Sequence, residues 1–127
     1  MAGSITQYLE DKIVDHILGT ATYTKPSSVY VALFTVIPTK STSGTEVTGG
    51  SYARQVATFT ASSSGLSSNS GNIDFTSMPT CTVVGVGVYD SSTTGNLLFF
   101  SPLDTNKSVT AGDTFRIATG DFDISIN

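Results

Sequence analysis

The stretch Ser28-Val-Tyr-Val-Ala-Leu-Phe-Thr35 decides the fold class of this 127-residue chain. It is rich in β-branched and aromatic residues, it follows Pro26, and it ends before Pro38. An apolar run of this composition, bounded by residues that interrupt regular structure, predicts a buried strand. We therefore expect a central strand here, at the heart of a β-rich core.

Further strands are predicted along the rest of the chain. Residues 82–89 carry Gly85 and Gly87 inside an otherwise apolar run, which indicates close backbone packing or a bulge. The turn-forming residues 90–96 follow, so this strand and the next should form a hairpin. The other predicted strands are residues 51–60, 72–75, 97–101, 108–110 and 114–117, and a C-terminal strand with Phe122, Ile124 and Ile126.

One helix is predicted, at the N-terminus. Ser4 and Gln7 have the spacing of a capping box, and Gly19 stands where a left-handed residue would end a helix. We therefore expect a helix over about residues 4–18. Its apolar residues recur at three- and four-residue spacing, at Ile5, Tyr8, Leu9, Ile13 and Ile17.

These elements predict a mainly β fold, an antiparallel β-sandwich of short strands with one N-terminal α-helix. A barrel of the same strands is the alternative. The length suits one hydrophobic core, so we expect residues 1–127 to form a single domain. Residues 38–50 and 61–71 are rich in Ser, Thr and Gly and are predicted to be loops that carry contacts.

Composition excludes several classes of partner. Charged residues make up only 13% of the chain, whereas 38 residues are Ser or Thr, which predicts a neutral, polar surface. Six basic residues against ten acidic ones disfavour binding to nucleic acid. No apolar run approaches the about 20 residues that span a bilayer, so we expect no membrane partner and synthesis in the cytoplasm.

The sequence predicts no enzyme and no cofactor. His16 is the only histidine, and the sequence contains no G-x-S-x-G motif whose serine could act as a nucleophile beside it. We therefore expect a structural or surface role for His16. Cys81 is the only cysteine and precedes an apolar strand. We therefore expect Cys81 to be a small buried side chain and not a nucleophile.

An ion site in the C-terminal region is an open alternative. Asp121 and Asp123 are two residues apart, which on a strand places both carboxylates on one face, and Asp104 and Asp113 could approach them. The sequence lacks a D-x-D-x-D-G loop, and alternating aspartates also protect an edge strand from pairing. We therefore predict no metal site, with calcium as the alternative.

Two places are candidates for contact with a partner. Val14 and Leu18 are displaced around the helix from Ile13 and Ile17, so a partner could bury them, or they could complete the protein's own core. Tyr52, with the loops 38–50 and 61–71, could instead form a sugar-binding surface.

Several segments together resemble a family of small tailed-bacteriophage virion proteins. The family is often labelled tail fibre or tail protein, and some members are similar to capsid decoration or cement proteins. The resemblance spans nearly the whole chain and brings no catalytic residues. The segments that carry it are residues 8–19, 23–35, 45–54 (Thr-Glu-Val-Thr-Gly-Gly-Ser-Tyr-Ala-Arg), 95–99 and 112–114.

The resemblance implies a non-enzymatic virion structural protein made in the bacterial host. The chain has neither heptads nor a repetitive stalk, which favours a globular subunit present in many copies. We therefore expect a capsid decoration or cement protein that stabilises the shell, with the major capsid protein and copies of itself as partners. The alternative is a tail fibre or tail-tip protein for host attachment, with a surface glycan as partner. We accordingly expect the capsid surface as its place on the virion, and the tail second.

Overall fold

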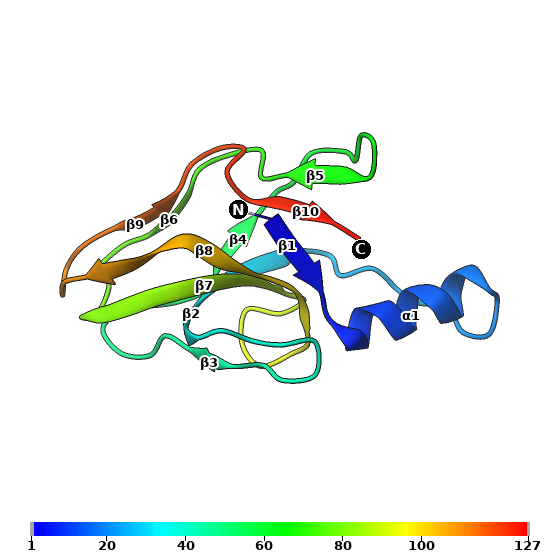
Figure 1. The fold of residues 1–127 in the computed structure, drawn as a ribbon, viewed down its shortest axis with the longest axis horizontal. Coiled ribbons are helices and arrows are strands. Elements are labelled where there is room, and N and C mark those ends of the chain that lie inside the picture. The colour runs from blue at the N-terminus through cyan, green and yellow to red at the C-terminus, as the bar shows by residue number, and fades with distance from the viewer. Residues whose placement is uncertain (1, 127) are drawn as a thin grey trace.

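The computed structural model describes residues 2–126, which form a ring of short strands from which a single helix projects (Figure 1). In chain order the elements are β1 (Ala2–Ile5), α1 (Gln7–Ile17), β2 (Val29–Val36), β3 (Thr45–Glu46), β4 (Gln55–Ala57), β5 (Leu66–Ser68), β6 (Ile73–Phe75), β7 (Cys81–Tyr89), β8 (Leu97–Val109), β9 (Phe115–Ile117) and β10 (Asp123–Ser125). The predicted mainly β fold with one N-terminal helix is confirmed.

The main sheet has the strand order β3-β2-β7-β8-β1-β10-β5, and β4 also pairs with β2. Its pairs are antiparallel except for β1 with β10, which is parallel. The predicted central strand is β2, and the predicted hairpin is formed by β7 and β8.

The sheet closes on itself through the segment after β4. Phe59 bridges to Asn69, the Thr60 amide donates to the Ser68 carbonyl at 2.9 Å, and the Ser70 amide donates to the Thr58 carbonyl at 2.9 Å. Since β4 pairs with β2 and this segment joins β5, the pairing runs around a closed ring. The strands therefore form a barrel-like body.

The core fills this ring. The pair β6–β9 forms a separate two-stranded sheet whose Ile73, Phe75, Phe115 and Ile117 all pack into the core. Strand β2 is buried on both faces, because its Val31 and Leu33 enter the core while Ala32 and Phe34 pack with Tyr89 and Leu97 on the other side. Burial on both faces explains why the β2 sequence is apolar without alternation.

The two strand glycines pack closely, as predicted. A Cβ atom on Gly87 would lie 2.7 Å from Cε2 of Phe34 and 2.8 Å from Cδ1 of Leu97. The β7–β8 register shifts at Gly85, because residues 103–106 of β8 bulge out opposite a single residue of β7. This bulge joins two predicted strands, residues 97–101 and 108–110, into one.

The start of the predicted helix is wrong. Residues 2–5 form β1, and α1 begins at Gln7 with Thr6 as its N-cap. The capping role falls to Thr6 because Ser4 and Ile5 pair with β8, where Ile5 is 1% exposed. The end is as predicted, since Leu18 is the C-cap and Gly19 has a φ of 81°.

Other boundaries differ in the Ser/Thr-rich regions. The predicted strand 51–60 is reduced to β4. The predicted loops 38–50 and 61–71 contain the short strands β3 and β5. Neither strand shows an apolar alternation, so only pairing with β2 and β10 defines them.

Candidate functional site

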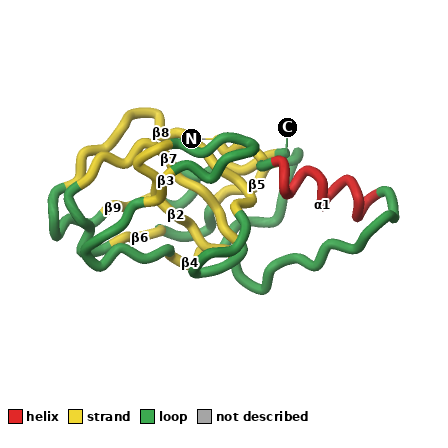
Figure 2. The backbone as a smooth tube through the Cα atoms, turned by 90° about the horizontal axis from the view of Figure 1, so that it is seen from below, coloured by secondary structure: helices red, strands yellow, loops and turns green. Residues whose placement is uncertain are grey.

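The helix α1 and the chain that returns from it project beyond the strands as an arm (Figure 2). Leu9 is the only buried residue of the helix among those described. It packs with Ile5 and Leu98, and Tyr8 and Ile13 add partly buried contacts. The first half of α1 is thus anchored on the body, and its second half extends past it.

The second half of α1 carries an exposed apolar surface. Val14 is 54% exposed, Ile17 72% and Leu18 73%. Their three- and four-residue spacing places them on one side of the helix. We call these three residues the α1 patch. Ile17 belongs to the apolar stripe predicted from the spacing, but it is exposed because the body ends before it, and neither Val14 nor Leu18 belongs to the core.

The return segment, residues 18–28, is tied to the helix by a few hydrogen bonds. The amides of Thr20 and Ala21 donate to the Asp15 carbonyl at 2.9 and 3.3 Å. The Tyr23 amide donates to Nδ1 of His16 at 3.1 Å. His16 therefore has a structural contact at the surface.

A second region of interest is the Glu46–Tyr52–Arg54 cluster, which lies within the segment 45–54 that carries the family resemblance. Arg54 donates twice to the Glu46 carboxylate, at 2.9 and 3.0 Å, and its side chain is only 9% exposed. Its Nη1 also donates to the carbonyls of Ser91 and Thr94 at 2.9 and 2.7 Å. The guanidinium carbon lies 3.6 Å from the centre of the Tyr89 ring. Arg54 thereby clamps the β7–β8 loop onto the body.

Tyr52 belongs to this cluster through its hydroxyl group. The hydroxyl donates to Glu46 at 2.7 Å and accepts from the Leu33 amide at 2.9 Å. Burial, together with the bond to Glu46, raises the pKa of Tyr52 far above its ordinary value, so the hydroxyl stays protonated. Its ring stacks on Phe75 with the centres 6.0 Å apart.

The structure does not gather the two predicted loops around Tyr52. Tyr52 lines a shallow hollow of about 410 Å³ together with residues 46–49 and 92–94, and no residue of 61–71 lines it. The ring and the hydroxyl of Tyr52 are committed to internal contacts. Tyr52 therefore has structural contacts through both its ring and its hydroxyl group.

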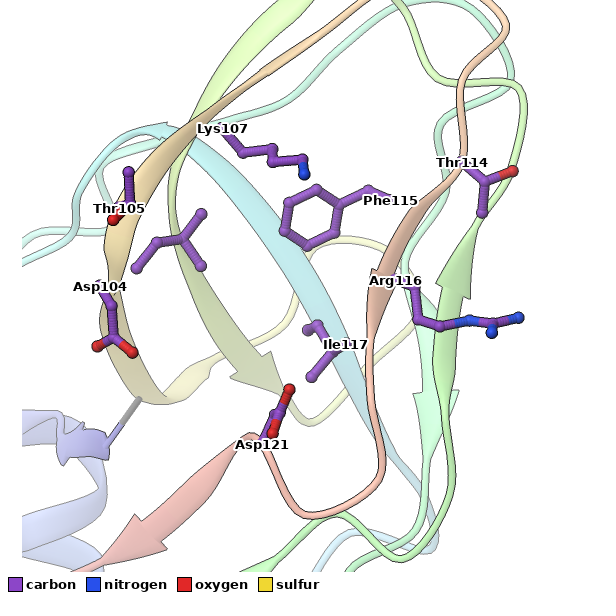
Figure 3. A pocket seen from close by; sticks show the side chains of 9 residues that line it. Asp104, Thr105, Lys107, Thr114, Phe115, Arg116, Ile117 and Asp121 are labelled. Carbon is purple, nitrogen blue, oxygen red and sulfur yellow. The ribbon is translucent and has the colours of Figure 1, made fainter.

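A hollow of about 520 Å³ lies between the β8 bulge and β9 (Figure 3). Lys107 and Phe115 approach each other across it, and Ile117 and Asp121 point into it (Figure 3). Arg116 turns away from the hollow and pairs with Asp74 at 2.6 Å. The hollow is lined by apolar, acidic and basic residues, and this mixture does not indicate one class of ligand.

Of the four aspartates considered for an ion site, Asp104 and Asp121 line the same hollow, whereas Asp113 and Asp123 do not line it. Asp121 precedes β10 instead of sharing a strand face with Asp123. Asp123 accepts a hydrogen bond from the Ser68 hydroxyl, and Asp113 accepts one from the Thr110 amide at 3.0 Å. Among residues 2–126, no group of three or more His, Cys, Asp or Glu residues is placed to hold a metal ion.

Two further features bear on the predicted chemistry. Cys81 is half-buried, and this burial raises the pKa of its thiol, which disfavours the reactive thiolate. In the described part of the chain, no helix combines the length and the apolar character needed to cross a bilayer.

Comparison with known proteins identifies the family. No curated protein sequence matches the chain. A family model described as podophage GP4 fiber I protein gp80 matches residues 4–125. The match includes α1, the α1 patch and the Glu46–Tyr52–Arg54 cluster, and it confirms the resemblance to tailed-phage virion proteins labelled as tail fibre. Because it covers almost the whole chain, this protein belongs to the podophage GP4 fiber I protein gp80 family of bacteriophage virion structural proteins.

Proposed function

We propose that this chain is a non-enzymatic subunit of a phage tail fibre and that it assembles with further copies of itself through the α1 patch. The observation that carries the proposal is the exposed apolar end of a helix that projects from an otherwise well-packed body. The description of the family as a fibre protein supports a place on the tail.

The energetics of the α1 patch favour a contact. Burying one aliphatic side chain stabilises an assembly by about 1.5 to 3 kcal/mol, and the patch presents three on one side of the helix. Exposed apolar side chains that gather in one place commonly mark an interaction site. A fibre needs repeated contacts between subunits, so a second copy is the partner that we assign to the patch.

The same surface would also serve a capsid decoration protein bound to the major capsid protein. The family match gives this location no support, because its description names a fibre. We therefore prefer the tail to the capsid surface. We do not propose glycan binding at Tyr52, because its hydroxyl is already bonded to Glu46 and to the Leu33 amide.

The geometry around His16 supports a role without catalysis. A general base uses an unprotonated ring nitrogen. Nδ1 of His16 already accepts the Tyr23 amide, so this nitrogen is engaged in holding the return segment.

Fractionation of purified virions tests the location. Heads and tails are separated, and the chain is quantified in each fraction by mass spectrometry. We expect it in the tail fraction. Its recovery only with heads, in hundreds of copies per particle, would overturn the fibre proposal and favour capsid decoration.

Analytical ultracentrifugation of the purified chain tests the self-assembly. We expect oligomers whose proportion rises with protein concentration. A single monomeric species across the micromolar range would contradict assembly through the α1 patch.

A further inference from the structure

We propose that β1 is exchanged between subunits: residues 2–6 of one copy insert between β8 and β10 of the next. This inference rests on the proposed self-assembly and specifies how the copies are joined. The exchanged strand belongs to the chain itself, so the partner is a second copy.

The position of β1 in the ring is the first argument. Ser4 and Ile5 pair with Phe100 and Phe99 of β8, whereas the preceding residues pair with β10. In the strand order of the sheet, β8 and β10 meet only through β1. Removing β1 would therefore open a slot with an unpaired strand edge on each side, which an extended segment would fill.

The contacts of β1 in this slot are specific. Ile5 is 1% exposed and packs with Leu9 and Leu98. The Thr6 hydroxyl donates to the carbonyls of Leu97 and Leu98 at 2.7 and 3.1 Å, and the Thr6 amide donates to Leu98 at 3.0 Å. The same segment of another copy would form every one of these contacts. Exchange therefore retains all of these contacts of β1 and Thr6 within the slot.

The connection between β1 and the rest of the chain is the second argument. Residues 7–28 form the projecting arm, with the first half of α1 anchored on the body. Opening the arm at Gly19 breaks the bonds of Thr20 and Ala21 to Asp15 and that of Tyr23 to His16, and it removes Tyr23 from its partly buried contact with the Ile5–Leu9–Leu98 cluster, a loss that burial of the α1 patch must offset. Gly19 has a φ of 81°, and a Cβ atom there would meet nothing within 4 Å, so the hinge is free of packing.

The opened arm is long enough to reach a neighbour. The 11 residues of α1 span about 16 Å. Residues 19–28 add up to about 33 Å when extended. A folded chain of 127 residues has a radius of gyration of about 14 Å, so the total reach of about 50 Å exceeds the width of one body.

Exchange also explains the α1 patch. An opened arm runs between two bodies, which places Val14, Ile17 and Leu18 in the space between them. Their burial there would favour the exchanged form over the closed one, whose slot contacts are identical. Exchange from each copy to the next builds a filament, because every body offers one slot and donates one strand.

Mixing two single-cysteine variants tests the exchange. One chain carries Ser4→Cys and the other Phe100→Cys, each with Cys81→Ser, because these positions face each other across β1 and β8. The two chains are unfolded, refolded together and oxidised. We expect disulfide-linked pairs of chains at least tenfold above a control mixture in which Ser92→Cys in the β7–β8 loop replaces Ser4→Cys.

A variant with both cysteines in one chain separates the possible outcomes. Exchange predicts a ladder of linked chains on a non-reducing gel. If only single chains with an internal disulfide appear while the protein still sediments as oligomers, exchange is wrong and self-assembly stands. A chain that sediments only as a monomer would refute both. If Phe100→Cys prevents folding, Gly3→Cys with Ile124→Cys, paired across β1 and β10, replaces it with the same expected results.

Discussion

The α1 patch leaves apolar side chains exposed to solvent, whereas the Glu46–Tyr52–Arg54 cluster forms its hydrogen bonds within the chain. The patch is apolar, and its three side chains are each more than half exposed. The cluster is polar, but Arg54 is 9% exposed, and the Tyr52 hydroxyl has two partners within the chain. The sequence offers Val14, Leu18 and Tyr52 as candidates for partner binding, whereas in the structure Val14 and Leu18 are exposed and the Tyr52 hydroxyl is bonded within the chain.

This contrast shows that a segment carrying the family resemblance can have a structural role. Residues 45–54 are one of the segments that carry the resemblance, and in the fold they connect β2, β3 and the β7–β8 loop. Buried polar groups must be paired, so the residue types in such a network are tightly constrained. We accordingly expect substitutions in the cluster to act on stability and substitutions in the α1 patch to act on assembly.

The largest effect is expected for Arg54→Ala. It leaves Glu46 without its two strongest donors and removes the clamp on the carbonyls of Ser91 and Thr94. We expect a loss of about 3 kcal/mol in the free energy of unfolding, measured by urea denaturation. Arg116→Ala is the matched control, because its pair with Asp74 is exposed and should matter far less. Equal losses for the two variants would show that the cluster is no clamp.

Leu18→Asp should weaken assembly by about 2 kcal/mol, or about 30-fold in the dissociation constant, because a carboxylate would be buried in the contact. Sedimentation equilibrium measures the constant. The melting temperature of the monomer should stay near that of the wild type, since Leu18 is 73% exposed. Thr22→Asp in the return segment controls for added charge. A melting temperature that falls in step with assembly would mean that Leu18 acts within the fold.

Tyr52→Phe tests the contribution of the Tyr52 hydroxyl to the cluster. The variant keeps the ring on Phe75 but leaves the Leu33 amide without its acceptor and Glu46 without one donor. We expect unfolding to become easier by about 1.5 kcal/mol, with assembly unchanged once the chain is folded. An unchanged stability combined with a loss of host-cell binding would restore Tyr52 as a contact residue.

The smallest effect is expected at the exposed pair of Asp74 and Arg116. The Arg116 guanidinium lowers the pKa of Asp74 below its ordinary value, so the pair stabilises the fold above the pKa of the unfolded chain. This contribution is lost as the pH falls below 4 through the folded pKa. Asp74→Asn should differ slightly from the wild type at pH 7 in urea denaturation, and the difference should shrink as the pH is lowered below 4. A gap that does not narrow on acidification would show that charge is not its cause.

Local patterns predicted most elements well, but they failed at the N-terminus. Ile5 fits the helical stripe of Leu9 and Ile13 by spacing, yet it lies in β1. The spacing of apolar residues cannot reveal that the slot between β8 and β10 requires a strand, because that slot is built by residues about 95 to 120 positions away. Strands β3 and β5, which lie in Ser/Thr-rich regions, were not predicted, because pairing with distant strands defines them and no apolar pattern marks them.

The amino-acid sequence by itself determined the mainly β class, the central strands β2 and β7, the β7–β8 hairpin and the end of α1 at Gly19. These features depend on local composition and on residues that interrupt regular structure, whose physical effects act within a few positions. Only the tertiary structure decided the closure of the ring by β1, the internal bonding of Tyr52 and the exposure of the α1 patch. Each of these depends on which distant backbone or side chain lies alongside, and burial becomes defined only when the chain has folded.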